Sequence, residues 1–402
     1  MQQYKKEWFG NIKGDILAGI VVCLALFPEV IGFMIVAGVP PVVGVYATFF
    51  ITAIAAFFGS SKGMISAAAG SVALVLAHLV AEYGIQYLFA ATILAGVLQV
   101  VLGFLKIGTL MRYIPKPVMI GFVNGLGIMM FTSQLDHFQG SLLLPLLGLL
   151  GIAIIFLFPR VTKKIPAPIV AIFVITAIVL GFGLDVKTLG DMGSISTDLP
   201  RFGIPAVPMT LETLRIIFPT ALSVAIVGLV ESLLTAQLVD EITEEKSDKN
   251  QETLSQGLGN VVSGFFGGIA GCGMIGQTII NLNYGGLGRL ATFLSGFFML
   301  LSVVLLNGSV VQIPVVALAA VMVVVSIETI NWDSIKRLRT NPKNESFAMI
   351  LTVAIVIGTH NLAYGVVAGT LVSAVFAAFK MSHLHVAAGT ADDDHHYKVD
   401  GH

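Results

Sequence analysis

The sequence predicts an all-α membrane protein built from about fourteen hydrophobic segments. Of its 402 residues 56% are hydrophobic and 11% are charged, with a mean hydropathy of +0.92, whereas soluble domains carry about 25% charged residues. Apolar runs also recur along the whole chain, and a helix needs roughly 20 apolar residues to cross a bilayer. The net charge of -1 offers no basic excess, so nucleic acid is not expected as a partner.

The expected spans are the hydrophobic runs between polar residues or Gly and Pro. They cover 15–36, 41–58, 64–81, 87–105, 113–134, 141–158, 165–183, 213–238, 251–268, 272–284, 287–306, 310–328, 346–360 and 363–380. Lysines and arginines concentrate on one side of this map, and only Lys187, Arg201 and Arg215 fall on the other. By the positive-inside rule we expect both termini in the cytoplasm and the protein in the cell (cytoplasmic) membrane.

The polar loop 184–212 divides the map into two sets of seven spans. The halves would therefore enter the membrane from opposite sides, and inverted repeats of this kind are typical of secondary transporters. We expect a first repeat at 1–183, an extracellular connector at 184–212, a second repeat at 213–380 and a cytoplasmic tail at 381–402.

Two segments rich in Gly, Ala and Ser occupy matching places in the halves. They are GSSKGMISAAAGS at 59–71 and GGIAGCGMIGQTIINLNYGG at 267–286, and each follows a glutamate in an apolar run, Glu29 or Glu231. Irregular backbone at membrane depth is tolerated where it lines a protein cavity, and matching breaks in two halves indicate a substrate site. A carboxylate at mid-membrane costs about 2.5–3.5 kcal/mol, so both glutamates are candidates for coupling a proton to transport.

Four stretches resemble the SulP (sulfate permease) family of anion transporters, in the same order as in that family. They are FPEVIGFMIVAGVPPVVGVYATFF (27–50), RYIPKPVMIGFVNGLGI (112–128), GLVESLLTAQLVDEITEEKSDKNQETLSQGLGNVVSGFFGG (228–268) and IPVVALAAVMVVV (313–325). The resemblance extends over about residues 10 to 385.

The resemblance implies a 7+7 inverted repeat with a core domain (spans 1–4 and 8–11) that moves against a gate domain (spans 5–7 and 12–14). Spans 3 and 10 would be short half-helices whose N-termini face one another, so that two helix dipoles and free N–H groups bind an anion. The implied substrate-binding residues are Glu29, Phe33, Ala69, Gly70, Ser71, Gly273, Met274, Ile275, Gly276 and Gln277.

The family also implicates the span 8 carboxylate in coupling, either as a proton acceptor or as a sodium ligand together with a hydroxyl one turn later. Glu231 and Thr235 would be that pair here, since residues at i and i+4 share a helix face. No other cofactor or metal is expected. Many relatives carry an arginine where this chain has Gln277, and its loss disfavours a large divalent anion such as sulfate.

We therefore expect a secondary active transporter of a small inorganic anion, of the bicarbonate or sulfate class, or of a carboxylate. Its partners would be the anion, membrane lipid and, by the resemblance, a second copy in a homodimer. The alternatives are a passive anion channel or exchanger, and a nucleobase permease of the same fold. An enzyme is not expected, because the spans contain no metal, nucleophile or phosphate-binding motif.

Five further residues in the spans receive structural interpretations. Gln99 and Asn124 are expected to bond neighbouring helices, and His78 is interpreted as a satisfied polar residue on a helix face. Cys23 and Cys272 are interpreted as buried thiols that act as small apolar groups.

Two polar segments are interpreted as solvated. The cytoplasmic run 241–252 is expected to be a loop without a specific ion site. Residues 381–402 are expected to be a tail that contains the linker to, and the first strand of, the STAS domain that follows the spans in the family that the sequence resembles. The chain is accordingly expected to be a piece of a longer protein.

Overall fold

The structure is a computed structural model that describes residues 2–109, 114–162, 165–192, 199–340 and 342–391. The chain divides into two compact units, Met1–Arg112 with Leu126–Ile330 and Tyr113–Gly125 with Asn331–His402. The helices and strands of the first unit are α1 (Gln2–Phe9), α2 (Ile12–Ala37), α3 (Pro41–Phe58), β1 (Ser66–Ala68), α4 (Gly70–Tyr83), α5 (Ile85–Phe104), η2 (Leu135–Phe138), α7 (Leu143–Leu157), η3 (Phe158–Arg160), α8 (Ala167–Phe182), η4 (Leu189–Met192), α9 (Leu211–Thr243), α10 (Lys249–Phe265), β2 (Gly271–Gly273), α11 (Ile275–Asn283), α12 (Arg289–Val310) and α13 (Val315–Thr329). Helix α6 (Lys116–Gln134) begins in the second unit and ends in the first, and the second unit continues with α14 (Trp332–Lys336), η5 (Arg337–Arg339), α15 (Lys343–Thr359) and α16 (Leu362–Ala391).

Every expected span overlaps a helix of the structure. Spans 3 and 10 differ from the rest, because each is a short strand followed by a helix, β1 with α4 and β2 with α11. Among the described residues, six helices are long and apolar enough to cross a membrane: α2, α3, α5, α6 with η2, α7 with η3, and α9. The short helices α1 and α14 were not among the expected spans.

The two Gly, Ala and Ser-rich segments lie side by side. Strands β1 and β2 pair antiparallel, with Ser66 opposite Gly273, Ala67 opposite Cys272 and Ala68 opposite Gly271. The pairing is so close that a Cβ on Gly271 would lie 2.1 Å from the Ala67 carbonyl oxygen. Small residues in both segments therefore allow the chain to form this two-stranded ribbon inside a bundle of helices.

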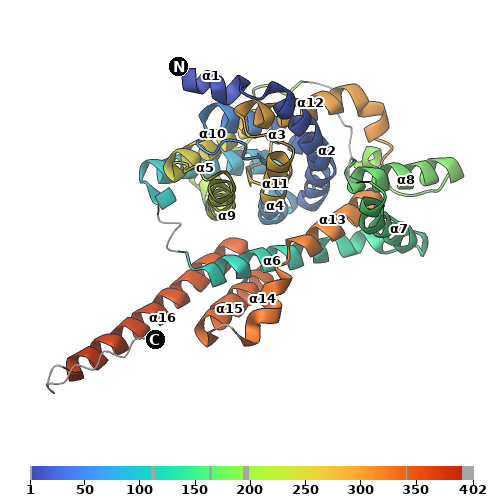
Figure 1. Ribbon diagram of the computed structural model, residues 1–402. Coiled ribbons are helices and arrows are strands. Elements are labelled where there is room, and N and C mark those ends of the chain that lie inside the picture. Colours follow the sequence, from blue (N-terminus) through green and yellow to red (C-terminus); the bar gives the residue numbers. More distant parts are fainter. Residues whose placement is uncertain (1, 110–113, 163–164, 193–198, 341, 392–402) are drawn as a thin grey trace. The chain divides into compact units, whose positions relative to one another are not determined.

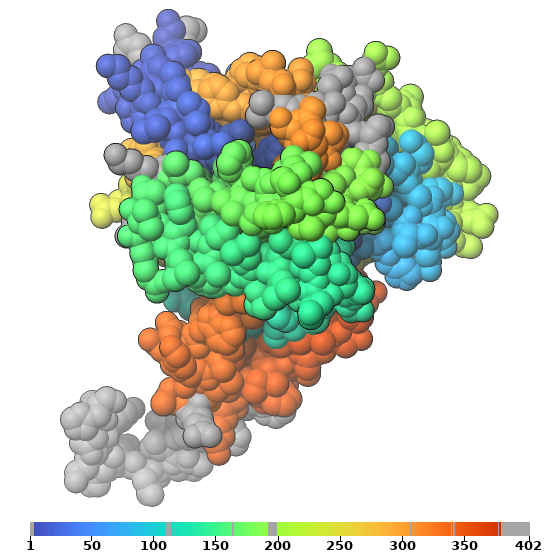
Figure 2. Space-filling model, turned by 90° about the vertical axis from the view of Figure 1, so that its right-hand side faces the viewer, coloured from blue at the N-terminus to red at the C-terminus, as the bar shows by residue number. Residues whose placement is uncertain are grey.

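Helices α2, α3, α4, α9 and α11 surround the ribbon, and α3 contacts both of its strands. Helices α4 and α11 continue from its strands, and both contact α2 and α9. Figure 1 shows α4 and α11 together between α9 and α2. Around this centre α12 packs on α2 and α3, and α10 packs on α3 and α5. Helices α7 and α8 pack on each other and on α13, and they form the green face in Figure 2.

The described parts of the connector 184–212 are held by hydrogen bonds at both ends. The Leu189 N–H donates to the Ile313 carbonyl over 2.9 Å. Beyond the undescribed residues 193–198, the Phe202 ring stacks on Phe265 with 5.3 Å between ring centroids, and the Gly203 N–H donates to the Phe265 carbonyl over 2.8 Å. These contacts attach the described parts of the connector to α10 and to the chain before α13.

The predicted interhelical role of two amides is confirmed. Gln99 on α5 accepts from Asn260 Nδ2 of α10 over 2.8 Å and donates to the Ala225 carbonyl of α9 over 3.3 Å. In the second unit, Asn124 Nδ2 donates to Ser334 Oγ over 2.9 Å. His78 is an exposed residue whose Nδ1 lies 3.6 Å from the Glu82 carboxylate, as expected of a polar residue on a helix face.

The expected strand in the tail is not present in its described part. Residues 381–391 continue α16 as a helix, and residues 392–402 lie outside the described residues.

Candidate functional site

The two helix starts at the ribbon are the centre of the candidate site. Helix α4 begins after Ala69 and α11 begins after Met274, and neither residue has a side-chain cap. The first intrahelical hydrogen bonds run from the Ala73 amide to the Ala69 carbonyl and from the Thr278 amide to the Met274 carbonyl. The amides of residues 70–72 and 275–277 come before these bonds and therefore have no intrahelical acceptor. Because the strands are antiparallel, the helices start beyond opposite ends of the ribbon. Two helix N-termini thus present their partial positive charges near one short ribbon.

Phe33 covers the start of α4. Its side chain is buried, and a Cβ on Gly70 would lie 2.7 Å from Phe33 Cε1 and 3.2 Å from Met130 Sδ. Gly70 therefore permits the close approach of the aromatic ring to the helix start. The structure brings these two predicted site residues into contact.

Glu231 on α9 reaches the ribbon and the start of α4. Its Oε2 accepts a hydrogen bond from Ser71 Oγ, and it also accepts one from Cys272 Sγ over 2.6 Å. The interpretation of Cys272 as an apolar group is therefore wrong, because its thiol bonds a carboxylate. Sequence reasoning missed this contact, since only the strand register places residue 272 beside α9.

Thr235 lies one turn beyond Glu231 and beside the ribbon. Its hydroxyl donates to the Glu231 backbone carbonyl over 2.8 Å, and a Cβ on Gly273 would lie 3.2 Å from Thr235 Cβ. The hydroxyl proton is thus used within the helix, while the oxygen keeps acceptor capacity. The side chains of Glu231 and Thr235 together offer oxygen ligands, the type that a hard cation such as sodium prefers.

Glu29 joins α2 to α11. Its carboxylate interacts with the Gln277 side chain at the start of α11. Pro28 precedes Glu29 inside α2, where a proline removes one backbone hydrogen bond and kinks the helix. Glu328 near the end of α13 interacts electrostatically with Glu29. Sequence reasoning missed Glu328, although it is the acidic residue of its apolar run.

The site residues differ in exposure. Ala69, Ser71, Gly273, Met274 and Gln277 are buried.

Ile275 and Gly276, in contrast, are exposed, and a Cβ on Gly276 would meet no atom within 4 Å. The open side of the candidate site therefore lies at the start of α11. Thr278 fixes this start by accepting a hydrogen bond from the Ile65 N–H over 3.0 Å.

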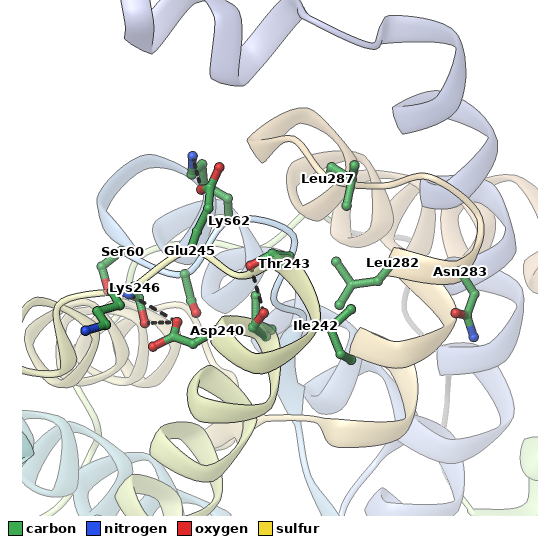
Figure 3. A pocket seen from close by; sticks show the side chains of 13 residues that line it. Ser60, Lys62, Asp240, Ile242, Thr243, Glu245, Lys246, Leu282, Asn283 and Leu287 are labelled. Atoms are coloured by element: carbon green, nitrogen blue, oxygen red, sulfur yellow. Dashed lines mark hydrogen bonds and ion pairs between the residues drawn. The ribbon is translucent and has the colours of Figure 1, made fainter.

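A cavity of about 380 Å³ with a mixed polar and apolar lining lies at the far end of α9, and no residue of the ribbon lines it. Figure 3 shows Lys62 against Glu245 at its edge, with 2.5 Å between Nζ and Oε2. Thr243 lines this cavity and lies twelve residues beyond Glu231 on α9, or about 18 Å along the helix axis. Its inner wall includes Val239 and Leu282, which pack in a buried apolar cluster with Met64 and Ala236.

The segment 241–252 is only partly a solvated loop, because α10 begins at Lys249. Glu252 is 1% exposed, and its Oε2 accepts hydrogen bonds from the Ser60 and Ser61 amides over 2.8 and 3.0 Å. The interpretation of the whole run as solvated is therefore wrong at Glu252. Asp240 binds Lys249 Nζ over 2.6 Å. Within the described residues no group of three or more His, Cys, Asp or Glu side chains could hold a metal ion.

Helices interrupted at a central ribbon, with acids beside them, define a multi-pass membrane transport protein. The comparisons agree, because the sulfate permease family matches residues 12–143 and 141–352. The chain belongs to this family. The family and the similar proteins are transporters and not enzymes.

Two curated relatives illustrate the range of similarity. The putative sulfate transporter YbaR of Bacillus subtilis (strain 168) is 53% identical over 391 residues, which are 96% of this chain and 81% of that protein. The bicarbonate transporter BicA of Picosynechococcus sp. is 29% identical over 421 residues, 96% of this chain and 73% of that protein.

Solved structures share the fold. The transmembrane domain of a cyanobacterium bicarbonate transporter BicA aligns with a TM-score of 0.79 at 26% identity, over 91% of this chain and 98% of that one. The structure of SLC26A9 aligns with a TM-score of 0.81 at 19% identity, over 92% of this chain and 66% of that one.

Proposed function

We propose that this protein is a secondary active transporter of a small inorganic anion, of the bicarbonate or sulfate class, or of a carboxylate. One observation supports this function most directly. Glu231 accepts a hydrogen bond from Ser71 at the start of α4, so an acid able to carry a coupling ion touches the place where an anion would bind. The anion would be held between the starts of α4 and α11, on backbone amides and on Ser71.

The charge of the site favours a singly charged substrate. Residues 65–72 and 271–278 contain no lysine or arginine, and the Gln277 side chain interacts with the Glu29 carboxyl group. The positive field then comes from two helix N-termini, each worth roughly half an elementary charge. That field matches bicarbonate or a monocarboxylate better than sulfate, which we place second.

Coupling follows from repulsion between like charges. An anion about 5 Å from an ionised Glu231 would be disfavoured by roughly 3 kcal/mol at an effective dielectric constant of 20. A proton on the carboxylate, or a sodium ion held by Glu231 and the Thr235 oxygen, removes that repulsion. Anion and cation would therefore bind together and cross the membrane together.

The movement we propose is that of a core, spans 1–4 and 8–11, against a gate, spans 5–7 and 12–14. The fourteen spans would form two inverted repeats, with both termini in the cytoplasm and a homodimer in the cytoplasmic membrane. The packing is compatible with this division in the first unit, where α2–α5 pack with α9–α12 and where α7 and α8 pack with α13.

Uptake into liposomes tests this function. The purified protein is reconstituted, and uptake of labelled bicarbonate, sulfate and fumarate is measured with pH and sodium gradients imposed separately. We expect one gradient to drive accumulation of an anion above its external concentration, and Glu231→Gln to abolish that accumulation. Flux that only dissipates an anion gradient would instead indicate a channel. Uptake no greater than that of empty liposomes for all three anions would refute the proposed function.

A further inference from the structure

Cys272 lies where both interrupted segments meet the acid of α9. Its Sγ donates to Glu231 Oε2 over 2.6 Å, and Ser71 Oγ donates to the same oxygen. The two donor atoms, Ser71 Oγ and Cys272 Sγ, are 3.9 Å apart. One carboxylate oxygen therefore has two donors, one from each half of the chain.

The two donors differ in what else they can bind. Ser71 is the second residue of α4, and its hydroxyl has a single proton. It donates either to Glu231 or to an anion at the helix start, and not to both. Cys272 is the middle residue of β2, paired with Ala67, and is 0% exposed. Its position is set by the ribbon backbone, and its thiol proton is directed to Glu231.

We propose that Cys272 is a positioning residue that keeps Glu231 hydrogen-bonded when Ser71 turns its hydroxyl to a bound anion. This inference rests on the proposed function, in which the anion binds at the start of α4. With the thiol in place, the anion takes one of two donors from the carboxylate. Without it, the anion takes the remaining donor, and a part-buried carboxyl group that loses both of its hydrogen-bond donors is disfavoured. Cys272 thereby sets the affinity for the anion.

Transport by three variants tests this role. In liposomes, Cys272→Ala should raise the KM for the labelled anion about tenfold, which corresponds to about 1.4 kcal/mol, with little change in maximal rate. Cys272→Ser keeps a donor at this position and should restore the KM. Cys23→Ala removes the other thiol of the chain, on α2, and is the matched control with an unchanged KM. An unchanged KM in Cys272→Ala, or a Cys272→Ser variant as impaired as Cys272→Ala, would overturn the assignment.

An infrared measurement tests the contact without any transport. In the Cys23→Ala protein Cys272 is the one remaining thiol, so its S–H stretching band is resolved. We expect the band below the frequency of a free thiol, a shift to higher frequency in Glu231→Gln, and a further change in frequency when bicarbonate, sulfate or fumarate binds.

The two experiments separate the two proposals. A band that is insensitive to both Glu231→Gln and the three anions overturns the role of Cys272 and leaves the proposed function standing. Failed uptake by the wild-type protein refutes the proposed function, while the response of the band to anions still decides whether Cys272 senses a bound anion.

Discussion

Gly70→Ala tests the packing of Phe33 on the start of α4. A Cβ at this position would lie 2.7 Å from Phe33 Cε1, and ordinary contact begins at 3.4 Å, so the ring must move by about 0.7 Å. Phe33 is 3% exposed, so the ring would have to move within the buried interior. Overpacking of this kind costs about 1–3 kcal/mol. We expect the free energy of unfolding, measured by denaturant titration in mixed micelles, to fall by that amount.

Gly276→Ala is the matched control at the other helix start. A Cβ there would meet no atom within 4 Å, so we expect the free energy of unfolding to change by less than about 0.5 kcal/mol. The added methyl group would still narrow the open side of the site, and the KM for the transported anion should rise. If Gly70→Ala proved as stable as the wild type, the tight contact between Phe33 and the helix start would be disproved.

Three further predictions concern acidic residues. Glu231→Gln should lower gradient-driven anion uptake at least about tenfold, because the substitution removes the carboxylate that carries the coupling ion. An unchanged rate and unchanged pH dependence would remove Glu231 from the mechanism. Glu252→Ala leaves the part-buried Ser60 amide and the buried Ser61 amide without their acceptor and should cost more than about 2 kcal/mol of unfolding free energy. Glu245→Ala removes an exposed ion pair and should cost less than about 1 kcal/mol; equal losses would contradict the burial argument. Hydrogen bonds from the amide and hydroxyl of Thr188 lower the pKa of Asp191. The ionised carboxylate therefore adds stability at pH values above its ordinary pKa, and this stability is lost as the pH falls through the lowered pKa. Asp191→Asn should reduce the unfolding temperature near about pH 7 and not near about pH 2, and a difference that does not depend on pH would count against this linkage.

The composition of the chain predicted the two interrupted segments and the acid beside them. Broken, small-residue backbone between apolar runs has few uses in a membrane, so 59–71 and 267–286 were recognisable without coordinates. Their pairing was not. Strands of three residues carry no periodicity, and the register that places Cys272 beside Glu231 depends on residues about 200 positions apart.

Glu252 differs from its sequence-based prediction because of tertiary packing. It ends a run of charged residues that was interpreted as a solvated loop, yet it lies in the first turn of α10. The sequence did contain a signal, because Asp248 caps this helix by accepting from the amides of Asn250 and Gln251. Recognising that cap would have placed Glu252 inside a helix, although its partners Ser60 and Ser61 come from tertiary packing.

The ribbon has a consequence for biosynthesis. Ala68 and its partner Gly271 are 203 residues apart, and ribosomes add about 5–20 residues per second. For roughly 10–40 s the nascent first half therefore exposes a strand edge that nothing yet covers. If the chain were divided in the connector, the ribbon would form only when both fragments were synthesised together, since each fragment contains only one of the two strands.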